Sequence, residues 1–157
     1  MDKLIVIENT RFIFETNFSG DPSRDRFHSD QRRANIIINN PELVQELIDN
    51  GFNVRETKPR PGEEEGHVPT YFIAIKANYG SKWPPKIYLV SGDSDPVLLD
   101  SETVCGLDHI SIDNVNVQLN TRFGENGNSL YIRTMYVEQG VSDDPFAERY
   151  ARRRITE

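Results

Sequence analysis

The stretch from Tyr71 to Val90 constrains the fold most, because it combines two β-strand patterns with a stiff connection. β-branched and aromatic residues dominate positions 71–78 and 86–90, as is typical of strands. A glycine and two adjacent prolines lie between these positions, and such residues mark a loop. The pattern therefore predicts a sheet hairpin in which residues 79–85 connect two strands.

The same stretch is basic within an acidic protein. It contains Lys76, Lys82 and Lys86 and no acidic residue, whereas the whole chain has a net charge of −7. It also contains Trp83, the only tryptophan. Lysines can follow the phosphates of a single strand of nucleic acid while flat rings stack on its bases. The stretch therefore indicates a groove for single-stranded nucleic acid, and the alternative is an ordinary hairpin with solvated lysines and core rings.

Only one face of the first strand can line such a groove, because side chains alternate along a strand. One face has Tyr71, Ile73 and Ile75, and the other has Phe72, Ala74 and Lys76. If the groove lies on the side of Lys76, Phe72 is a better stacking candidate than Tyr71. The loop residues Tyr79, Lys82 and Trp83 do not depend on this choice, and they are the strongest candidates.

Composition limits the remaining possibilities. A chain of 157 residues with 36% hydrophobic residues predicts one domain with a modest core. The acidic balance argues against a protein that coats duplex DNA by bulk charge. No apolar run approaches the roughly 20 residues of a membrane helix, and the N-terminus has no signal-peptide pattern. A single cysteine, Cys105, fits a reducing compartment, so we expect a cytoplasmic protein without membrane contact.

One amphipathic helix is the best-specified element. Asn40 can cap its N-terminus, Pro41 fits its first turn, and Asn50-Gly51 supplies a stop. Its apolar residues fall on one face at helical spacing: Leu43, Val44, Leu47 and Ile48. We expect this helix to pack against a sheet and to carry no functional site.

The other elements predict a mainly β fold. A long first strand covers residues 3–14, interpreted as Leu4, Val6, Phe12 and Phe14 alternating with polar neighbours, with a bend or bulge at 8–10. A second hairpin joins 110–119 to 129–137 through a turn that contains Asn-Gly. About seven strands, one helix and long charged loops predict a closed or nearly closed antiparallel barrel. We expect a barrel domain at 1–137 and a flexible charged tail at 138–157.

The polar loop after the first strand offers further candidates. Phe18 and Phe27 lie in it among arginines, where they can either stack on bases or fold back onto the sheet edge. Its arginines can reach phosphates, and Arg11 and Arg133 lie in the flanking strands. The full set of candidate nucleic-acid-binding residues is Arg11, Arg24, Arg26, Phe27, Phe72, Lys76, Tyr79, Lys82, Trp83, Lys86, Tyr88 and Arg133.

The sequence gives no support for catalysis. The histidines His28, His67 and His109 have neither metal-ligand nor triad spacing, and no glycine-rich phosphate loop is present. Residues 91–116 contain six carboxylates and no Lys or Arg, but a two-metal nuclease also needs a nearby base. We therefore expect no catalytic residue, no metal site and no cofactor.

A series of short motifs resembles a group of small phage and prophage proteins that are similar to single-stranded DNA-binding proteins. The motifs cover residues 11–137 in this order: Arg11-Phe12, Asn17-Phe18-Ser19-Gly20, Ile36-Ile37-Ile38, Asn50-Gly51-Phe52-Asn53-Val54-Arg55, Ala74-Ile75-Lys76-Ala77-Asn78-Tyr79, Pro84-Pro85-Lys86-Ile87-Tyr88-Leu89 and Tyr131-Ile132-Arg133-Thr134-Met135-Tyr136-Val137. The resemblance implies an OB-like Greek-key barrel and a role in phage DNA replication or recombination.

Two functional hypotheses from different classes follow. The first is a non-catalytic single-stranded DNA-binding protein, with replication or recombination proteins as further partners and a homo-oligomer as one form. The second is an acidic phage protein that mimics DNA and inhibits a host protein through the carboxylates of residues 63–65 and 91–116. The second hypothesis requires those carboxylates to lie together on one exposed face.

Overall fold

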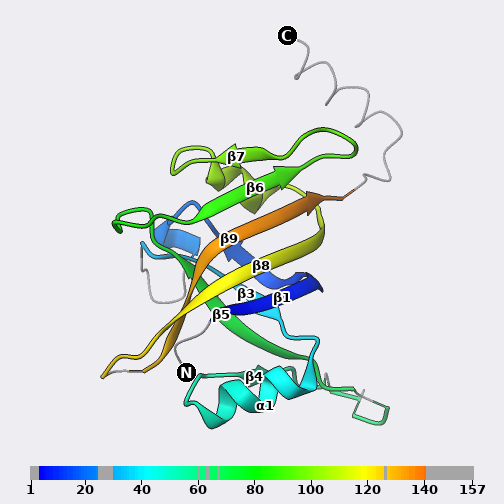
Figure 1. Ribbon diagram of the computed structural model, residues 1–157. Helices are drawn as coiled ribbons and strands as arrows, with labels where there is room; N and C mark the ends of the chain where they lie inside the picture. Colours follow the sequence, from blue (N-terminus) through cyan, green and yellow to red (C-terminus); the bar gives the residue numbers. More distant parts are fainter. Residues whose placement is uncertain are drawn as a thin grey trace.

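The computed structural model describes residues 4–24, 30–59, 61–62, 64–66, 68–125 and 127–140. Nine strands form one strongly curved sheet, with one α-helix near its lower end (Figure 1). The strands are β1 (Ile5–Thr10), β2 (Phe12–Asn17), β3 (Arg32–Ile37), β4 (Arg55–Glu56), β5 (Tyr71–Ala77), β6 (Lys86–Val90), β7 (Val97–Leu99), β8 (Ile112–Arg122) and β9 (Ser129–Gln139). The helices are α1 (Pro41–Asp49) and the 3-10 helices η1 (Pro22–Arg24) and η2 (Val104–His109).

The strand order defines the topology. The main path is β1-β8-β9-β5-β3-β2, with β4 beside β5 and with β6 between β7 and β9. Most neighbours are antiparallel, but β9 pairs in parallel with both β5 and β6. The strands β1 and β2, at the two ends of this path, follow each other in the chain with only Arg11 between them. They are two halves of one bent strand, and the predicted bend near residues 8–10 is confirmed by the register shift after Ile7.

This order is that of an OB-like fold. With β1 and β2 counted as one strand, the five strands are β1/β2, β3, β5, β8 and β9, and they follow the partly open Greek-key path of that fold. The prediction of a mainly β, OB-like protein is therefore confirmed. Strand pairing alone does not close the predicted barrel. Within the described residues, β1 and β2 at the two ends of the path are joined through the chain at Arg11 and not by hydrogen-bonded pairing.

The predicted strands at 71–78 and 86–90 are present, but the predicted hairpin between them is wrong. Among the described residues, no pairing joins β5 to β6. Both strands instead lie in line along β9, with Ile75 opposite Leu130 and Ile87 opposite Met135. Since both run parallel to β9, the connection with the double proline keeps its direction rather than reversing it. An 11-residue β9 is long enough to pair with both strands.

The predicted start and end of helix α1 are confirmed. The Asn40 side chain accepts a hydrogen bond from the backbone N–H of Glu42 at 3.0 Å, and Pro41 is the first helical residue. Gly51 follows the helix with a φ of +82°, a left-handed conformation that glycine adopts at little cost. Val44 and Leu47 are buried, as expected of the apolar face. In chain order, α1 follows β3 and precedes β5. A second insertion, made of β6, β7 and η2, separates β5 from β8.

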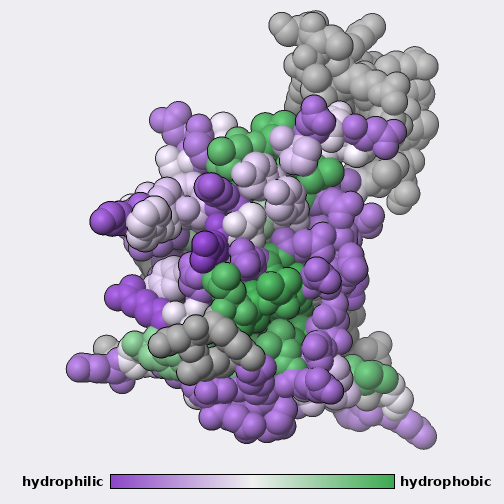
Figure 2. Space-filling model, in the orientation of Figure 1, coloured by the Kyte–Doolittle hydropathy of each residue, from purple (hydrophilic) through white to green (hydrophobic). Residues whose placement is uncertain are grey.

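The core lies inside the curved sheet. It corrects the interpretation of the first strand and decides between the two alternatives for Phe18. On β1, Ile5 and Ile7 are buried, whereas Leu4 and Val6 are 39% and 53% exposed. Figure 2 shows the resulting apolar area over β1 on one face of the molecule. Phe18 is fully buried and meets Phe12 edge to face at 5.5 Å, so it is a core residue and not an exposed stacking candidate.

The predicted boundary of the C-terminal tail differs from the observed strand end. Glu138 and Gln139 belong to β9, so the sheet extends past residue 137. The remaining tail, residues 141–157, lies outside the described residues. Within the described part, no helix is long and apolar enough to cross a membrane.

Candidate nucleic-acid interface

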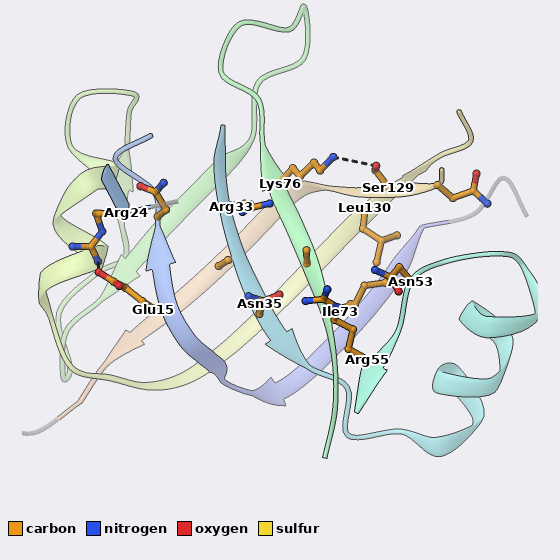
Figure 3. A pocket seen from close by; sticks show the side chains of 14 residues that line it. Glu15, Arg24, Arg33, Asn35, Asn53, Arg55, Ile73, Lys76, Ser129 and Leu130 are labelled. Atoms are coloured by element: carbon orange, nitrogen blue, oxygen red, sulfur yellow. Dashed lines mark hydrogen bonds and ion pairs between the residues drawn. The ribbon is translucent and has the colours of Figure 1, made fainter. Parts of the chain in front are cut away.

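A groove of about 410 Å³ lies on the outer face of β3 and β5 (Figure 3). Four cationic side chains and one carboxylate line it, in a protein whose net charge is −7. The cations come from four separate elements: Arg24 of η1, Arg33 of β3, Arg55 of β4 and Lys76 of β5. The carboxylate is that of Glu15 on β2. The groove therefore concentrates positive charge on one face of an acidic molecule.

The floor of the groove follows from strand alternation. On β3, Ala34 and Ile36 point into the core, which leaves Arg33 and Asn35 on the outer face. On β5, Ile73 and Ile75 are core residues, and Ala74 and Lys76 point outward, as the sequence pattern predicts. The register sets Arg33 opposite Lys76 and Asn35 opposite Ala74, so the groove residues of the two strands lie side by side.

Lys76 lies at the centre of a basic and aromatic cluster. Its Nζ donates a hydrogen bond to Ser129 Oγ at 3.3 Å and lies 5.9 Å from the centre of the Tyr131 ring. The guanidinium of Arg122 lies at the same distance from that ring. Cations over an aromatic face are attracted by its quadrupole. Tyr131 and Arg122 were not among the sequence candidates. The parallel pairing of β5 with β9 brings Tyr131 beside Lys76, and the pairing of β8 with β9 brings Arg122 to the same ring.

Arg24 forms one wall of the groove and is engaged in structural contacts. Its Nε and Nη2 donate to the backbone oxygen of Thr16, and Nη2 forms an ion pair with Glu15 at 2.9 Å. Part of its charge is therefore compensated inside the protein. Arg33, Arg55 and Lys76 lie along the floor and the other wall, and Figure 3 shows Arg33 pointing toward Lys76.

The loop at residues 78–85 follows directly after β5, beyond the Lys76 end of the groove (Figure 3). Trp83 is 81% exposed on this loop, with Lys82 Nζ 5.8 Å from the centre of its ring. Lys86 is exposed where β6 begins. Arg133 is exposed on β9, between the part that pairs with β5 and the part that pairs with β6. These four candidates therefore surround the break between β5 and β6.

The other aromatic candidates have less accessible rings. Phe72 is 6% exposed, although it lies on the same face as Lys76. Tyr88 stacks on Tyr136 of β9 at 4.7 Å, so one face of its ring is covered. Tyr79 is partly buried against the core, with the Arg32 guanidinium 5.2 Å from its ring centre.

The remaining candidates lie at the periphery or outside the described residues. Arg11 is exposed at the junction of β1 and β2, and its backbone oxygen accepts a hydrogen bond from Ile37. Arg26 and Phe27 lie outside the described residues. Two groove cations, Arg33 and Arg55, were missing from the sequence candidates, although Arg55 belongs to a motif of the resemblance.

Tyr79 gives a prediction about stability. Its hydroxyl is buried and has no hydrogen-bond partner among the described residues, and this burial raises its pKa to about 12. The hydroxyl ionises less readily in the folded protein than in the unfolded chain, so stability falls as the pH rises from about 10 to 12. Replacing Tyr79 by Phe should leave stability at neutral pH unchanged or raise it by about 1 kcal/mol. The variant should also lose less stability than the wild-type protein when the pH is raised. Urea unfolding at pH 7 and at pH 11 would measure this difference.

An unfolding free energy that falls by more than about 2 kcal/mol in Tyr79→Phe at pH 7 would contradict this account, because it would mean that the hydroxyl has a partner. Tyr71→Phe is a suitable control, since Tyr71 is also partly buried against the core but lies at the opposite end of β5.

In the acidic segment at 91–116, one of the six carboxylates is withdrawn from the surface, and the other five acidic residues are exposed. The Asp108 side chain is fully buried. Asp100 stays exposed and accepts hydrogen bonds from the backbone N–H groups of Thr103 and Glu102. These contacts lower the pKa of Asp100. In the ranges that the structure describes, no group of three His, Cys, Asp or Glu residues is placed to hold a metal ion.

The fold and the groove together define a class of protein. OB folds bind oligonucleotides on the face of their second and third strands and on the loops beside it, and here those strands are β3 and β5. The groove lies on that face, so the chain is of the oligonucleotide-binding class. More particularly, residues 1–156 match the family described as "Putative phage ssDNA-binding domain". The chain belongs to this family of phage single-stranded DNA-binding domains.

Solved structures with a similar fold are distant in sequence. The C-terminally truncated single-stranded DNA-binding protein from bacteriophage Enc34 has 9% identity and a TM-score of 0.50, with 88% of this chain and 87% of that one covered. The single-stranded DNA-binding protein gp2.5 of bacteriophage T7 has 10% identity and a TM-score of 0.45, with 93% and 96% covered. The comparison with curated proteins returns no match.

Proposed function

We propose that this chain is a non-catalytic protein of phage DNA replication or recombination that binds single-stranded DNA in the groove over β3 and β5. The observation that carries the proposal is the cationic groove on the ligand-binding face of an OB-like sheet, in a protein of net charge −7. Family membership supports single-stranded DNA as the ligand. Other replication or recombination proteins and a second copy of the chain are further partners, in the host cytoplasm.

The groove suggests how the strand lies. Arg55 lies near one end of the groove, opposite Phe72 of β5, and Arg33 and Lys76 face each other four residues further along β5. The three cations can contact neighbouring phosphates of one strand. The strand then passes the Lys76 end of β5 toward the loop at 78–85, where the exposed Trp83 ring stacks on a base. Lys86 and Arg133 lie near the point where the strand leaves the groove. Binding through phosphates and stacking gives affinity with little sequence preference.

Loss of the Trp83 ring should weaken binding without affecting the fold. Stacking contributes on the order of 1–3 kcal/mol per base, so Trp83→Ala should lower the affinity for oligo-dT roughly 5- to 100-fold. Because the side chain is 81% exposed, the melting temperature should stay within about 2 °C. Fluorescence anisotropy of a labelled oligo-dT and a thermal melt measure the two effects. Unchanged affinity would remove Trp83 from the interface.

The proposed function itself is tested by titrating a labelled oligo-dT with the purified wild-type protein at low and at physiological salt. We expect saturable binding, quenching of Trp83 emission and an affinity that falls as salt rises. A duplex of the same length should bind more weakly. No binding at low salt would overturn the proposal. The DNA-mimic hypothesis then becomes the one to test, although the burial of Asp108 already removes one of its carboxylates.

A further inference from the structure

We propose that Phe14 is a base-stacking platform at the Arg55 end of the groove, where one nucleobase of the bound strand lies against its ring. This proposal deepens the function proposed above and rests on it. Strand alternation alone groups Phe14 with Phe12, so the sequence pattern does not single it out.

The Phe14 ring is exposed on a sheet face. It is 65% exposed, whereas Phe12, two residues earlier, packs against the core. An aromatic ring that remains in water loses the free energy that burial would supply. Every nucleobase has a flat face that can cover such a ring, whatever the sequence of the strand. Exposure of the ring therefore fits a role in binding better than a role in the core.

The contacts of the ring place it beside the groove, next to residues that line it. Phe14 meets the Phe72 ring edge to face, with centroids 5.1 Å apart and planes at 79°. Phe72 shares its strand face with Ala74 and Lys76, which line the groove, and it pairs with Arg55, which also lines it. Phe72 is 6% exposed and can therefore support the Phe14 ring from the side. A base on Phe14 would have Arg55 within reach of its phosphate.

The backbone at this position is unusual. Phe14 has a φ of +63°, and the pairing of β2 with β3 shifts register between Ile13 and Asn17. A positive φ is a rare conformation for a bulky side chain, and bulges commonly redirect side chains beside functional sites. A regular strand would point Phe14 to the same side as Phe12. The bulge turns the ring outward instead, and strain of this kind collects at ligand sites.

The test compares Phe14→Gly with the wild-type protein and with Phe14→Tyr. Glycine removes the ring and tolerates the positive φ, so the melting temperature should be unchanged or higher while the affinity for oligo-dT falls about 5- to 100-fold. Phe14→Tyr keeps the ring and should bind within about twofold of wild type. Val6→Ala is the control, since Val6 is an exposed apolar residue of β1 outside the groove.

A second measurement does not depend on the folding of a variant. An oligo-dT containing 5-iododeoxyuridine is irradiated with the wild-type protein, and the cross-linked peptide is identified by mass spectrometry. We expect a cross-link at Phe14. If wild type binds but shows no cross-link at Phe14, or if Phe14→Gly binds as wild type does, this inference is overturned and the proposed function stands. If wild type does not bind oligo-dT, both fail.

Discussion

Replacing Arg33 and Lys76 together by glutamate is expected to lower the affinity for oligo-dT by about 100-fold or more at low salt, because phosphate contacts dominate such affinity. The two residues lie opposite each other on neighbouring strands at the groove floor. Reversal of their charge leaves Arg55 as the main cation of the floor and places two carboxylates beside the strand. Repulsion then replaces two phosphate contacts.

The salt dependence gives a second, independent readout of the same contacts. Each phosphate contact with a single strand contributes about 0.7 to the slope of log K against log salt. The neutral double variant Arg33→Ala with Lys76→Ala should therefore reduce the slope by about 1.4. Lys58→Glu is the matched control, because Lys58 is an exposed lysine that does not line the groove. A double variant with the slope of wild type would contradict the placement of the strand.

Replacing Asp108 by Ala is expected to produce the largest loss of stability of any acidic residue in the 91–116 segment. Its side chain is fully buried at the end of η2. The carboxylate accepts hydrogen bonds from Thr16 Oγ1 at 2.7 Å and from the backbone N–H groups of Phe18 and Ser19 at 2.8 and 2.9 Å. Alanine would leave buried donors without a partner, at a cost of about 3 kcal/mol or more.

This loss should be visible in both stability and binding. About 3 kcal/mol corresponds to a melting temperature roughly 6–12 °C lower for a protein of this size. Asp108 also holds the chain between β2 and η1, which carries the groove residue Arg24. Without this contact the wall of the groove should be less well ordered. The affinity for oligo-dT should therefore fall even at temperatures where the variant is folded. Asp113→Ala, an exposed change in the same segment, should stay within about 0.5 kcal/mol. Equal stability of the two variants would refute the anchoring role.

The sequence predicted correctly those elements whose signals lie within a few neighbouring residues. The cap at Asn40, the stop at Gly51 and the hairpin of β8 and β9 are all confirmed, because capping and turn chemistry act over a few residues. The basic stretch with Lys76 and Trp83 was also visible, since it stands out in an acidic chain. The resemblance to phage single-stranded DNA-binding proteins is confirmed by family membership.

Pairing between distant strands could not be deduced in the same way. The 71–90 stretch has the pattern of a hairpin, and only the length of β9 shows that β5 and β6 can lie in line beside it. The first strand was placed on the wrong face because Leu4 and Val6 are as apolar as Ile5 and Ile7. The outward turn of Phe14 depends on a bulge whose position no residue type signals.

The residues of the groove were also only partly predictable, because distant strands bring them together. Lys76 was recognised from its neighbours in sequence, but Arg33, Arg55 and Tyr131 reach it only through the register of three other strands. Arg24 was recognised as a cation, whereas its contacts with Glu15 and Thr16 required the folded loop. The sequence thus identified a part of the proposed binding surface, and strand order brings the other residues of the groove beside it.

The central claim is that single-stranded DNA lies over β3 and β5, and NMR titration of isotopically labelled protein with oligo-dT tests it most directly. We expect the largest amide shifts on β3 around Arg33, on β5 around Lys76, in the 78–85 loop and at residues 128–131, with little change in β7. Shifts confined to the acidic 91–116 segment or to the apolar face over β1 would contradict the account.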